Sequence, residues 1–325
     1  MRTLTIVSPV YRESAVLRAF HAELSRALVA IEPRYRVDFL FVVDPGGDDT
    51  VAVLEDLARE DPRVRVIVMS ARFGHQAALV AGLDHCDADA VVMLDSDLQH
   101  PPALVPELVE RFEEGFDIVN TVREDPRGSS RVGRLTSGMF YRVLAWLSDT
   151  RVPAGSADFR LLSRRVVRVF QLQLRERNQF LRGLVAWVGF PTATMRYTAG
   201  QRRVGTSKYS FRRRLGFGID GVVSFSKRPL VASIVVGTVV GIFAVLYAAY
   251  GLIVWLTASS PPHGWTSMVL LLSLFSAVQL VFLGVLGLYL GAVFDEVKAR
   301  PHYVVERTIN VSAPVDPARS PKDAA

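Results

Sequence analysis

The chain has 325 residues, half of them apolar, and a formal net charge of +6. This length exceeds one domain of roughly 200 residues, so we expect a domain with a sizeable core and a smaller second part. The single cysteine, Cys86, excludes an internal disulfide and fits a reducing compartment. The sequence has neither zinc-ligand spacing nor a GxxxxGK[ST] phosphate loop, which argues against a zinc site and a P-loop.

Four apolar segments of strand length alternate with helical patterns in the first part of the chain. TLTIVSPV is followed by helical spacing at Leu17, Phe20, Leu24 and Leu28. VDFLFVVD, VRVIVMS and AVVMLD come next, each followed by a helical pattern, at 51–58, 77–86 and 103–115. Continuous apolar strands separated by helices predict an α/β domain with a mainly parallel sheet that is covered on both faces.

Polar side chains follow each of these four strands. Single turns of this kind often only cap a helix, but four turns that converge on the carboxyl edge of one sheet favour a binding site. In chain order these residues are Pro9 and Glu13, then Asp44, then Arg72, Gly74, His75 and Gln76, and finally Asp95, Asp97 and Gln99.

The fourth turn, DSDLQHPP, has the most specific chemistry. Asp95, Asp97 and Gln99 would point the same way if the strand continued through them. Two carboxylates and an amide oxygen suit a hard divalent cation such as Mg²⁺ or Mn²⁺. A DxD pair alone is a weak signal, and its place at the end of a buried strand strengthens it.

Two long apolar segments occupy the last third of the chain. Residues 230–256 and 266–294 contain no Asp, Glu, Lys or Arg, and each exceeds the roughly 20 residues that cross a bilayer as a helix. We therefore expect a two-helix transmembrane hairpin. Two buried helices of a soluble protein are the alternative.

The basic residues around this hairpin predict its orientation. They precede the first span and follow the second, whereas the connecting TASSPPHGW carries no charged side chain apart from His263. The positive-inside rule then places the N-terminal domain and both termini in the cytosol, at the cell membrane. MRTLTIVSPVYRES lacks the apolar core of a signal peptide, in agreement with that placement. Beside two spans, the positive charge favours lipid phosphate over nucleic acid as a partner.

These observations divide the chain into four parts. We expect an α/β domain at 1–208, interfacial amphipathic helices at 209–228, the hairpin at 229–294 and a cytosolic tail at 295–325. Small-residue spacings in the hairpin favour close helix packing, either within one chain or in a homo-oligomer. The glycines concerned are Gly237, Gly241, Gly284, Gly287 and Gly291.

Several motifs occur in the order seen in one known family. They are SPVYRES, VVDPGGDDT, ARFGHQ, DSDLQHPP, ADFRLLSRR, ERNQFLRG, RRVGTSKY and YLGAVFDEVKARPHYVVER. The chain resembles family 2 glycosyltransferases that charge polyprenyl phosphates, such as undecaprenyl-phosphate sugar transferases and dolichol-phosphate mannose synthase. The resemblance covers about residues 3 to 308. It implies a GT-A fold and the inverting transfer of a single sugar from a UDP- or GDP-sugar to a lipid phosphate on the cytosolic face.

The resemblance also implies roles for individual residues. Asp95, Asp97 and Gln99 would surround a cation that bridges the diphosphate of the donor. The other implied donor contacts are a nucleoside pocket of Pro9, Glu13 and Asp44 and the neighbouring run from Arg72 to Gln76. A loop with Arg202, Ser207 and Lys208 would close over the donor and acceptor phosphates.

Asp158 and Arg160, in ADFRLLSRR, leave alternatives open. With a hydroxyl acceptor Asp158 would be the general base. A lipid phosphate is already largely ionised, since its second pKa is about 6, so Asp158 would instead orient the acceptor. Arg160 suits bidentate binding of a phosphate, and the structural alternative is an Asp–Arg pair that locks a loop.

The chain also departs from the family. Asp44 is followed by Pro45 where relatives usually have a second acid, so the choice between UDP and GDP stays open. His100 stands where relatives often have Asp, and we assign it no role. QFLRG at 179–183 lacks the Trp of the QxxRW signature, which favours single transfer over a processive polysaccharide synthase. The retained acids and basic residues disfavour a non-catalytic membrane scaffold, and the two spans with a large cytosolic domain disfavour a lipid flippase.

Overall fold

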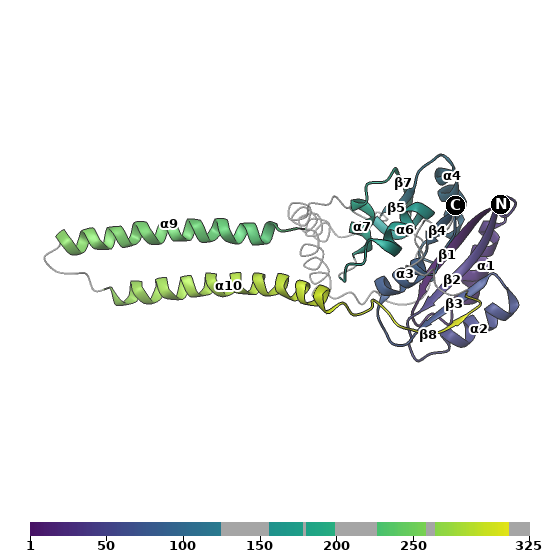
Figure 1. Cartoon of the computed structure of the whole chain (residues 1–325), viewed down its shortest axis with the longest axis horizontal. Helices are drawn as coiled ribbons and strands as arrows, with labels where there is room; N and C mark the ends of the chain where they lie inside the picture. Colours follow the sequence, from purple (N-terminus) through teal and green to yellow (C-terminus); the bar gives the residue numbers. More distant parts are fainter. Residues whose placement is uncertain (125–155, 178–179, 199–225, 258–263, 312–325) are drawn as a thin grey trace.

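A computed structural model describes residues 1–124, 156–177, 180–198, 226–257 and 264–311. An α/β domain forms one end of the molecule, and two long helices extend from it side by side (Figure 1). β1 begins at the end of the domain that is farthest from these helices. The carboxyl edge of the parallel strands therefore lies on the side of the domain that faces the two helices.

The described strands form one sheet in the order β7-β5-β6-β4-β1-β2-β3-β8. The central block of β4, β1, β2 and β3 is parallel, as predicted, and β6 and β8 run antiparallel to their neighbours in that block. The bounds are β1 (Arg2–Val10), β2 (Tyr35–Val43), β3 (Val64–Met69), β4 (Ala90–Met93), β5 (Ile118–Glu124), β6 (Ser156–Ser163), β7 (Thr192–Thr198) and β8 (Val305–Ile309).

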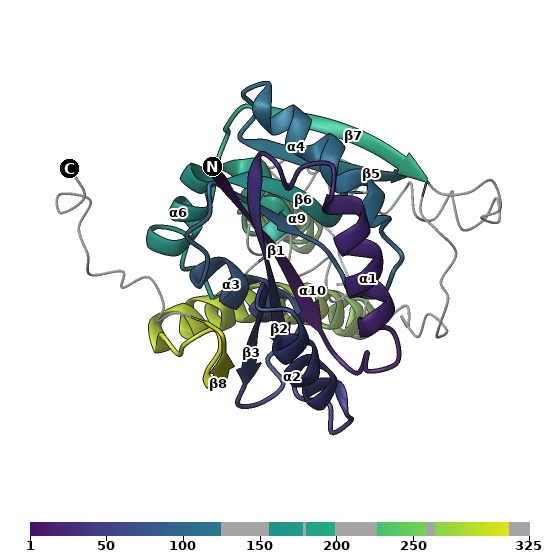
Figure 2. The same ribbon diagram turned by 90° about the vertical axis from the view of Figure 1, so that its right-hand side faces the viewer.

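Helices cover both faces of the sheet. Successive side chains of each buried strand point to opposite faces, and both sets are apolar, so each face needs a cover. Ile6 packs in a core with Leu24 and Leu54, whereas the adjacent Val7 packs in a second core with Leu79 and Leu184. In Figure 2, α1 lies on one side of β1 and α3 and α6 lie on the other. The first core receives α1 (Leu17–Leu28), α2 (Thr50–Glu60), the 3₁₀ turn η1 (Pro102–Leu104) and α4 (Val105–Glu113), and the second receives α3 (His75–Asp84), α6 (Arg164–Leu172) and α7 (Leu181–Trp187).

One glycine allows α3 to lie directly on the sheet. A Cβ atom at Gly82 would stand 2.3 Å from Cγ1 of Val7, a distance that real Cβ atoms do not adopt. Any larger residue would push α3 away from β1. Because α3 begins at His75, this close approach also fixes the start of the helix at the carboxyl edge of the sheet.

The segment after the last helix returns to the α/β domain, so part of the expected tail at 295–325 belongs to the sheet. β8 pairs with β3, and Ser70 N–H donates to the carbonyl of Val304 at 2.9 Å. The Tyr303 hydroxyl donates to Asp84 at 2.9 Å, and the Asn310 amide donates to two carbonyl groups at the end of α2 and the start of β3. The sheet is thus completed by a strand that follows the hairpin in sequence.

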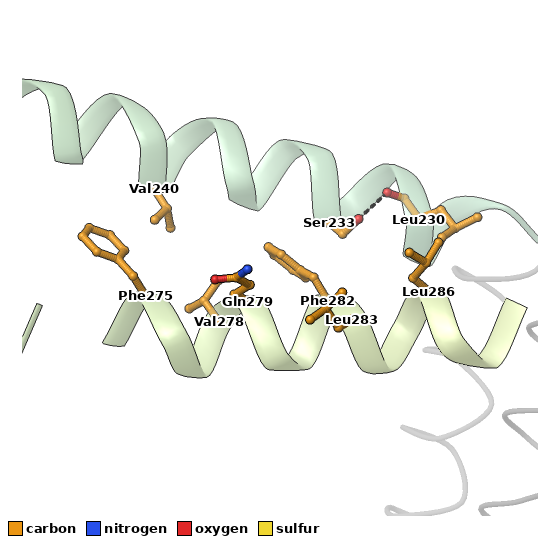
Figure 3. A pocket seen from close by; sticks show the side chains of 9 residues that line it. All are labelled: Leu230, Ser233, Val240, Phe275, Val278, Gln279, Phe282, Leu283 and Leu286. Atoms are coloured by element: carbon orange, nitrogen blue, oxygen red, sulfur yellow. Dashed lines mark hydrogen bonds between the residues drawn. The ribbon is translucent and has the colours of Figure 1, made fainter. Parts of the chain in front are cut away.

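The two long helices are α9 (Arg228–Thr257) and α10 (Trp265–Lys298). Both are long and apolar enough to cross a membrane, and their most apolar windows are not buried. Exposed Ile, Leu, Val and Phe side chains along both helices argue against two buried helices of a soluble protein. A groove of about 340 Å³ separates them, with Ser233, Gln279 and Phe282 between the helices (Figure 3). These features indicate a membrane-associated protein.

Candidate active site

The described polar residues that follow the four parallel strands lie at the carboxyl edge of the sheet. β4 ends at Met93, next to β1 on one side and to β6 on the other. In the last register pair of these antiparallel strands, Met93 lies opposite Arg160. Asp158 precedes Arg160 in β6 and therefore lies past the end of β4. The turn after β4 is therefore flanked by residues that follow β1 and by residues of β6.

β4 ends at Met93 and the turn after it does not continue the strand, so the condition under which Asp95, Asp97 and Gln99 would form a row is not met. Leu98 has a positive φ of 60°, which reverses the chain within the turn. The Asp97 carboxylate accepts the Gln99 backbone N–H at 3.0 Å, and it also accepts from the Gln99 side-chain amide. Asp97 and Gln99 therefore come together through a turn that Asp97 itself stabilises.

Asp95 lies between two histidines. Its Oδ1 is 2.9 Å from Nε2 of His75, and its Oδ2 is 3.4 Å from Nε2 of His100. Burial opposes ionisation of Asp95, but both imidazoles favour it and hold the pKa of the carboxyl well below its ordinary value. Burial alone would lower the pKa of His75; the contact with Asp95, with the charge of Asp158 in addition, raises it instead. His100, to which the sequence analysis assigned no role, is thus a direct neighbour of Asp95.

Glu13 is joined to the same turn through Ser96. The Ser96 hydroxyl contacts both the Glu13 carboxyl group and the carbonyl of Pro9, the latter at 3.1 Å. Burial raises the pKa of Glu13 to about 7; the charges of Asp97 and Asp95 add to the rise and the Ser96 contact opposes it. A hydroxyl has one hydrogen, so a protonated Glu13 that donates to Ser96 satisfies both contacts.

Asp44 holds the loop that follows β3. Its two carboxylate oxygens accept the backbone N–H groups of Phe73 and Gly74, each at 2.8 Å. Gly74 has a φ of 97°, which favours glycine at this position. The preceding Arg72 lies over the ring of Tyr11 at 4.1 Å. Asp44 thus fixes the loop from which α3 and His75 start.

Asp158 forms a buried ion pair with two arginines. Arg182 binds it bidentately, through Nε and Nη2 at 2.8 Å each, and Nη2 of Arg160 lies 3.7 Å away. Burial opposes ionisation of Asp158, but Arg182 first and Arg160 next keep its pKa below the ordinary value. Such a carboxylate is a poor general base, and this geometry favours the alternative that Asp158 orients other groups.

Arg160 is only 1 % exposed, so its burial does not support the predicted phosphate clamp. Burial lowers the pKa of Arg160 to about 10. Its Nη2 donates to the carbonyl of Ala157 at 2.8 Å, and its Nε has no hydrogen-bond partner within the described residues. The side chain of Arg182 is 40 % exposed, which makes it the more accessible arginine of the pair.

Gln76 links α3 to α7. Its Oε1 accepts the backbone N–H of Leu181, at the start of α7, at 3.3 Å. The next residue is Arg182, so the helix that supplies Arg182 is anchored beside His75. The predicted phosphate-binding residues Arg202, Ser207 and Lys208, and the expected interfacial helices at 209–228, lie outside the described residues except for Ser226 to Arg228.

The turn fits a divalent cation by its donor chemistry. Asp95, Asp97 and Gln99 supply two carboxylates and an amide oxygen, and the neighbouring Glu13 has a raised pKa partly because of the two aspartates. A bound cation would relieve that repulsion. No three His, Cys, Asp or Glu side chains converge as a metal cage in the part of the chain that the structure describes. The remaining ligands would have to come from the donor and from water.

Three participants were missed as site residues from sequence. Ser96 is buried inside the turn, Arg182 pairs with Asp158, and the Tyr197 hydroxyl bonds His100. Ser96 lies within the DSDLQ stretch, and Arg182 is the arginine of QFLRG, so both stand in motifs that the sequence analysis had identified. Tyr197 had none, because its partner lies 97 positions earlier in the sequence.

The mainly parallel sheet carries carboxylates at its carboxyl edge and lies beside two apolar helices that are long enough to cross a membrane, in agreement with a GT-A fold. The chain belongs to glycosyl transferase family 2, whose family model matches residues 5–170. It is therefore a glycosyltransferase.

Relatives match over almost the whole chain. The uncharacterized glycosyltransferase YkcC of Bacillus subtilis is 36 % identical over 94 % of both chains. The SfII prophage-derived bactoprenol glucosyl transferase of Shigella flexneri is 34 % identical, over 94 % of this chain and 98 % of its own. A crystal structure of glucosyl-3-phosphoglycerate synthase from Mycobacterium tuberculosis with Mn²⁺, UDP-glucose and phosphoglyceric acid is 22 % identical, covering 68 % of this chain and 80 % of that one, with a TM-score of 0.44.

Proposed function

We propose that this enzyme transfers one sugar from a UDP- or GDP-sugar to a polyprenyl phosphate, with inversion and with Mg²⁺ or Mn²⁺ as cofactor. The acceptor is undecaprenyl phosphate or a related lipid, and the product serves cell-envelope glycan synthesis or lipid modification. The reaction takes place on the cytosolic face of the cell membrane, with both termini in the cytosol.

One observation carries this proposal. The acidic turn after β4 lies at the sheet edge that faces the two apolar helices, so a nucleotide sugar and a lipid phosphate can meet there. Similarity to bactoprenol glucosyl transferases extends through both helices, which supports a lipid acceptor. Two candidate spans among the described residues also suit single transfer better than export of a polymer.

The donor binds along the ends of β1, β2, β3 and β4. Pro9, Glu13 and Asp44 line the nucleoside pocket, and the loop from Arg72 to Gln76, which Asp44 holds in place, lies beside the sugar diphosphate. Asp95, Asp97 and Gln99 hold the cation. When bound, the cation neutralises charge that develops on the leaving diphosphate, a contribution worth several kcal/mol.

The acceptor needs little help from a base. A phosphate oxygen of the lipid forms a bond to the anomeric carbon while the bond from that carbon to the diphosphate oxygen breaks, and attack from the opposite side inverts the configuration. The acceptor phosphate is already ionised near neutral pH. Asp158 stays ionised between Arg160 and Arg182 and orients Arg182 at the edge of the site. Arg202, Ser207 and Lys208 bind the phosphates.

The test uses the purified full-length protein in detergent with undecaprenyl phosphate and a panel of UDP- and GDP-sugars. With Mn²⁺ present, mass spectrometry of the lipid fraction should show the addition of one sugar from one donor, and EDTA should abolish the product. A polymer of sugars on the lipid, or no product with any donor, contradicts the proposal.

A further inference from the structure

His100 is buried in an aromatic cluster directly behind the acidic turn. It is 8 % exposed, and its ring centroid lies 5.7 Å from Phe159 and 5.7 Å from Tyr197. Nδ1 of His100 forms a hydrogen bond with the Tyr197 hydroxyl, and Nε2 faces Asp95. The contact joins the turn after β4 to β7, which lies beyond β6 and β5 in the sheet.

The two histidines on Asp95 differ in their freedom. The side chain of His75 is 43 % exposed and lies 2.9 Å from Oδ1 of Asp95, whereas that of His100 is 10 % exposed and faces Oδ2. His75 is therefore the more accessible of the two partners of Asp95. His100 is enclosed by Phe159 and Tyr197.

In the row of contacts from Asp95 through His100 to Tyr197, the chemistry of each group determines which atom carries the hydrogen. An ionised carboxylate only accepts hydrogen bonds, so the 3.4 Å contact between Nε2 of His100 and Oδ2 of Asp95 is favourable when Nε2 carries the hydrogen. In the neutral imidazole Nδ1 is then an acceptor, and the Tyr197 hydroxyl has to donate to it. Without the hydroxyl, a buried Nδ1 would lack its donor, and the other tautomer would present a lone pair to Asp95.

We propose that His100 and Tyr197 are positioning residues for the cation site, an inference that rests on the proposed function. Tyr197 sets the tautomer of His100, and His100 holds Oδ2 of Asp95. Only Oδ1 then exchanges its contact with His75 for the cation. Outer contacts of this kind orient metal-binding groups in many sites. Because β7 ends at Thr198, the same contact joins the cation site to the strand that precedes Arg202 in the sequence.

Tyr197→Phe tests this positioning role, because it removes one oxygen atom and keeps the ring. Mn²⁺ binding is measured by electron paramagnetic resonance on the full-length protein in detergent. We expect the variant to bind Mn²⁺ about tenfold more weakly than the wild type. In the transfer assay the Mn²⁺ requirement should rise while KM for the lipid acceptor stays unchanged.

Two substitutions of His100 and one of Phe159 serve as matched controls. A glutamine amide reaches the position of Nε2, so His100→Gln should keep most of the wild-type Mn²⁺ affinity. An asparagine amide reaches only toward Tyr197, so His100→Asn should lose it. Phe159→Leu weakens the aromatic cluster without removing a hydrogen bond. It should lower the melting temperature and leave Mn²⁺ affinity unchanged.

Wild-type Mn²⁺ affinity in Tyr197→Phe and His100→Asn would overturn the proposal, and so would a wild type that binds no Mn²⁺. Equal weakening in Phe159→Leu and Tyr197→Phe would show that packing alone matters, and would also overturn it. A wild type that binds Mn²⁺ and glycosylates no lipid defeats the proposed function only. The Mn²⁺ series then still decides whether Tyr197 and His100 position Asp95.

Discussion

Two carboxylates at the same edge of the sheet have opposite kinds of partners. Asp95 lies between the imidazoles of His75 and His100, whereas Asp158 lies between the guanidinium groups of Arg160 and Arg182. An imidazole has a pKa near neutrality and binds a carboxylate reversibly; a guanidinium stays charged and binds it bidentately. Asp95 is thus suited to exchange a partner for a cation, and Asp158 is suited to hold a fixed arrangement.

Replacing either carboxylate of the proposed cation site should have the largest effect on catalysis. Asp95→Asn and Asp97→Asn should each lower kcat by about a hundredfold or more, because the loss of cation binding removes several kcal/mol of transition-state stabilisation. Initial rates at saturating donor and lipid measure this effect. A variant that keeps more than half of the wild-type rate would break the assignment of the cation to this turn.

Replacing the fixed carboxylate should mainly affect stability. Asp158→Asn leaves the buried Arg160 without its counter-charge, and we expect the free energy of unfolding to fall by about 3 kcal/mol. Thermal unfolding in detergent, followed by circular dichroism, reports this as a lower melting temperature. Arg182→Gln is the milder control, because Arg182 is partly exposed. An unchanged melting temperature in Asp158→Asn would contradict the structural role.

Glu13 offers a third carboxyl group, with the opposite pH dependence to Asp158. Its pKa in the folded protein is raised to about 7, so its contribution to stability is present below its ordinary pKa of 4.5 and is lost as the pH rises through 7. In EDTA, Glu13→Gln should therefore gain about 2 kcal/mol of stability relative to the wild type between pH 5 and pH 8. Melting temperatures at both pH values measure the gain. A difference that does not depend on pH would mean that Glu13 is ionised throughout.

An exposed arginine–carboxylate pair provides the baseline for the buried one. Nη1 of Arg307 on β8 lies 2.8 Å from Glu55, with both side chains substantially exposed. Arg307→Ala should change the free energy of unfolding by at most about 0.5 kcal/mol, since water and salt screen such pairs. The same thermal assay checks it. A loss of stability as large as that expected for Asp158→Asn would show that the attachment of β8, and not the burial of the ion pair, determines how much the pair contributes to stability.

The parallel half of the fold was predictable because its signal is local. Apolar runs end in polar turns, and the intervening helices repeat apolar residues at helical spacing, as in Leu17, Phe20, Leu24 and Leu28. β8 was missed because Val305–Ile309 is a mainly exposed edge strand whose partner, β3, lies more than two hundred residues earlier. Pairing at such separation leaves no periodic pattern in the sequence.

The site was predictable in its acids and not in their partners. Asp95, Asp97 and Gln99 stand within five residues, so their chemistry can be seen in the sequence. The turn that brings Asp97 and Gln99 together depends on the positive φ of Leu98, which no pattern indicates. The contacts from His75 and His100 to Asp95, and from Arg182 to Asp158, exist only once the strands are placed side by side.

The contrast between the two carboxylates is tested most directly by a structure of the full-length protein with Mn²⁺ and a nucleoside diphosphate. We expect Oδ1 of Asp95 to leave His75 and to coordinate the cation, while His100 stays at Oδ2. Asp158 should keep both contacts to Arg182 at 2.8 Å. Mn²⁺ bound by Asp158, or an Asp95 still paired with His75 beside an occupied site, would contradict the account.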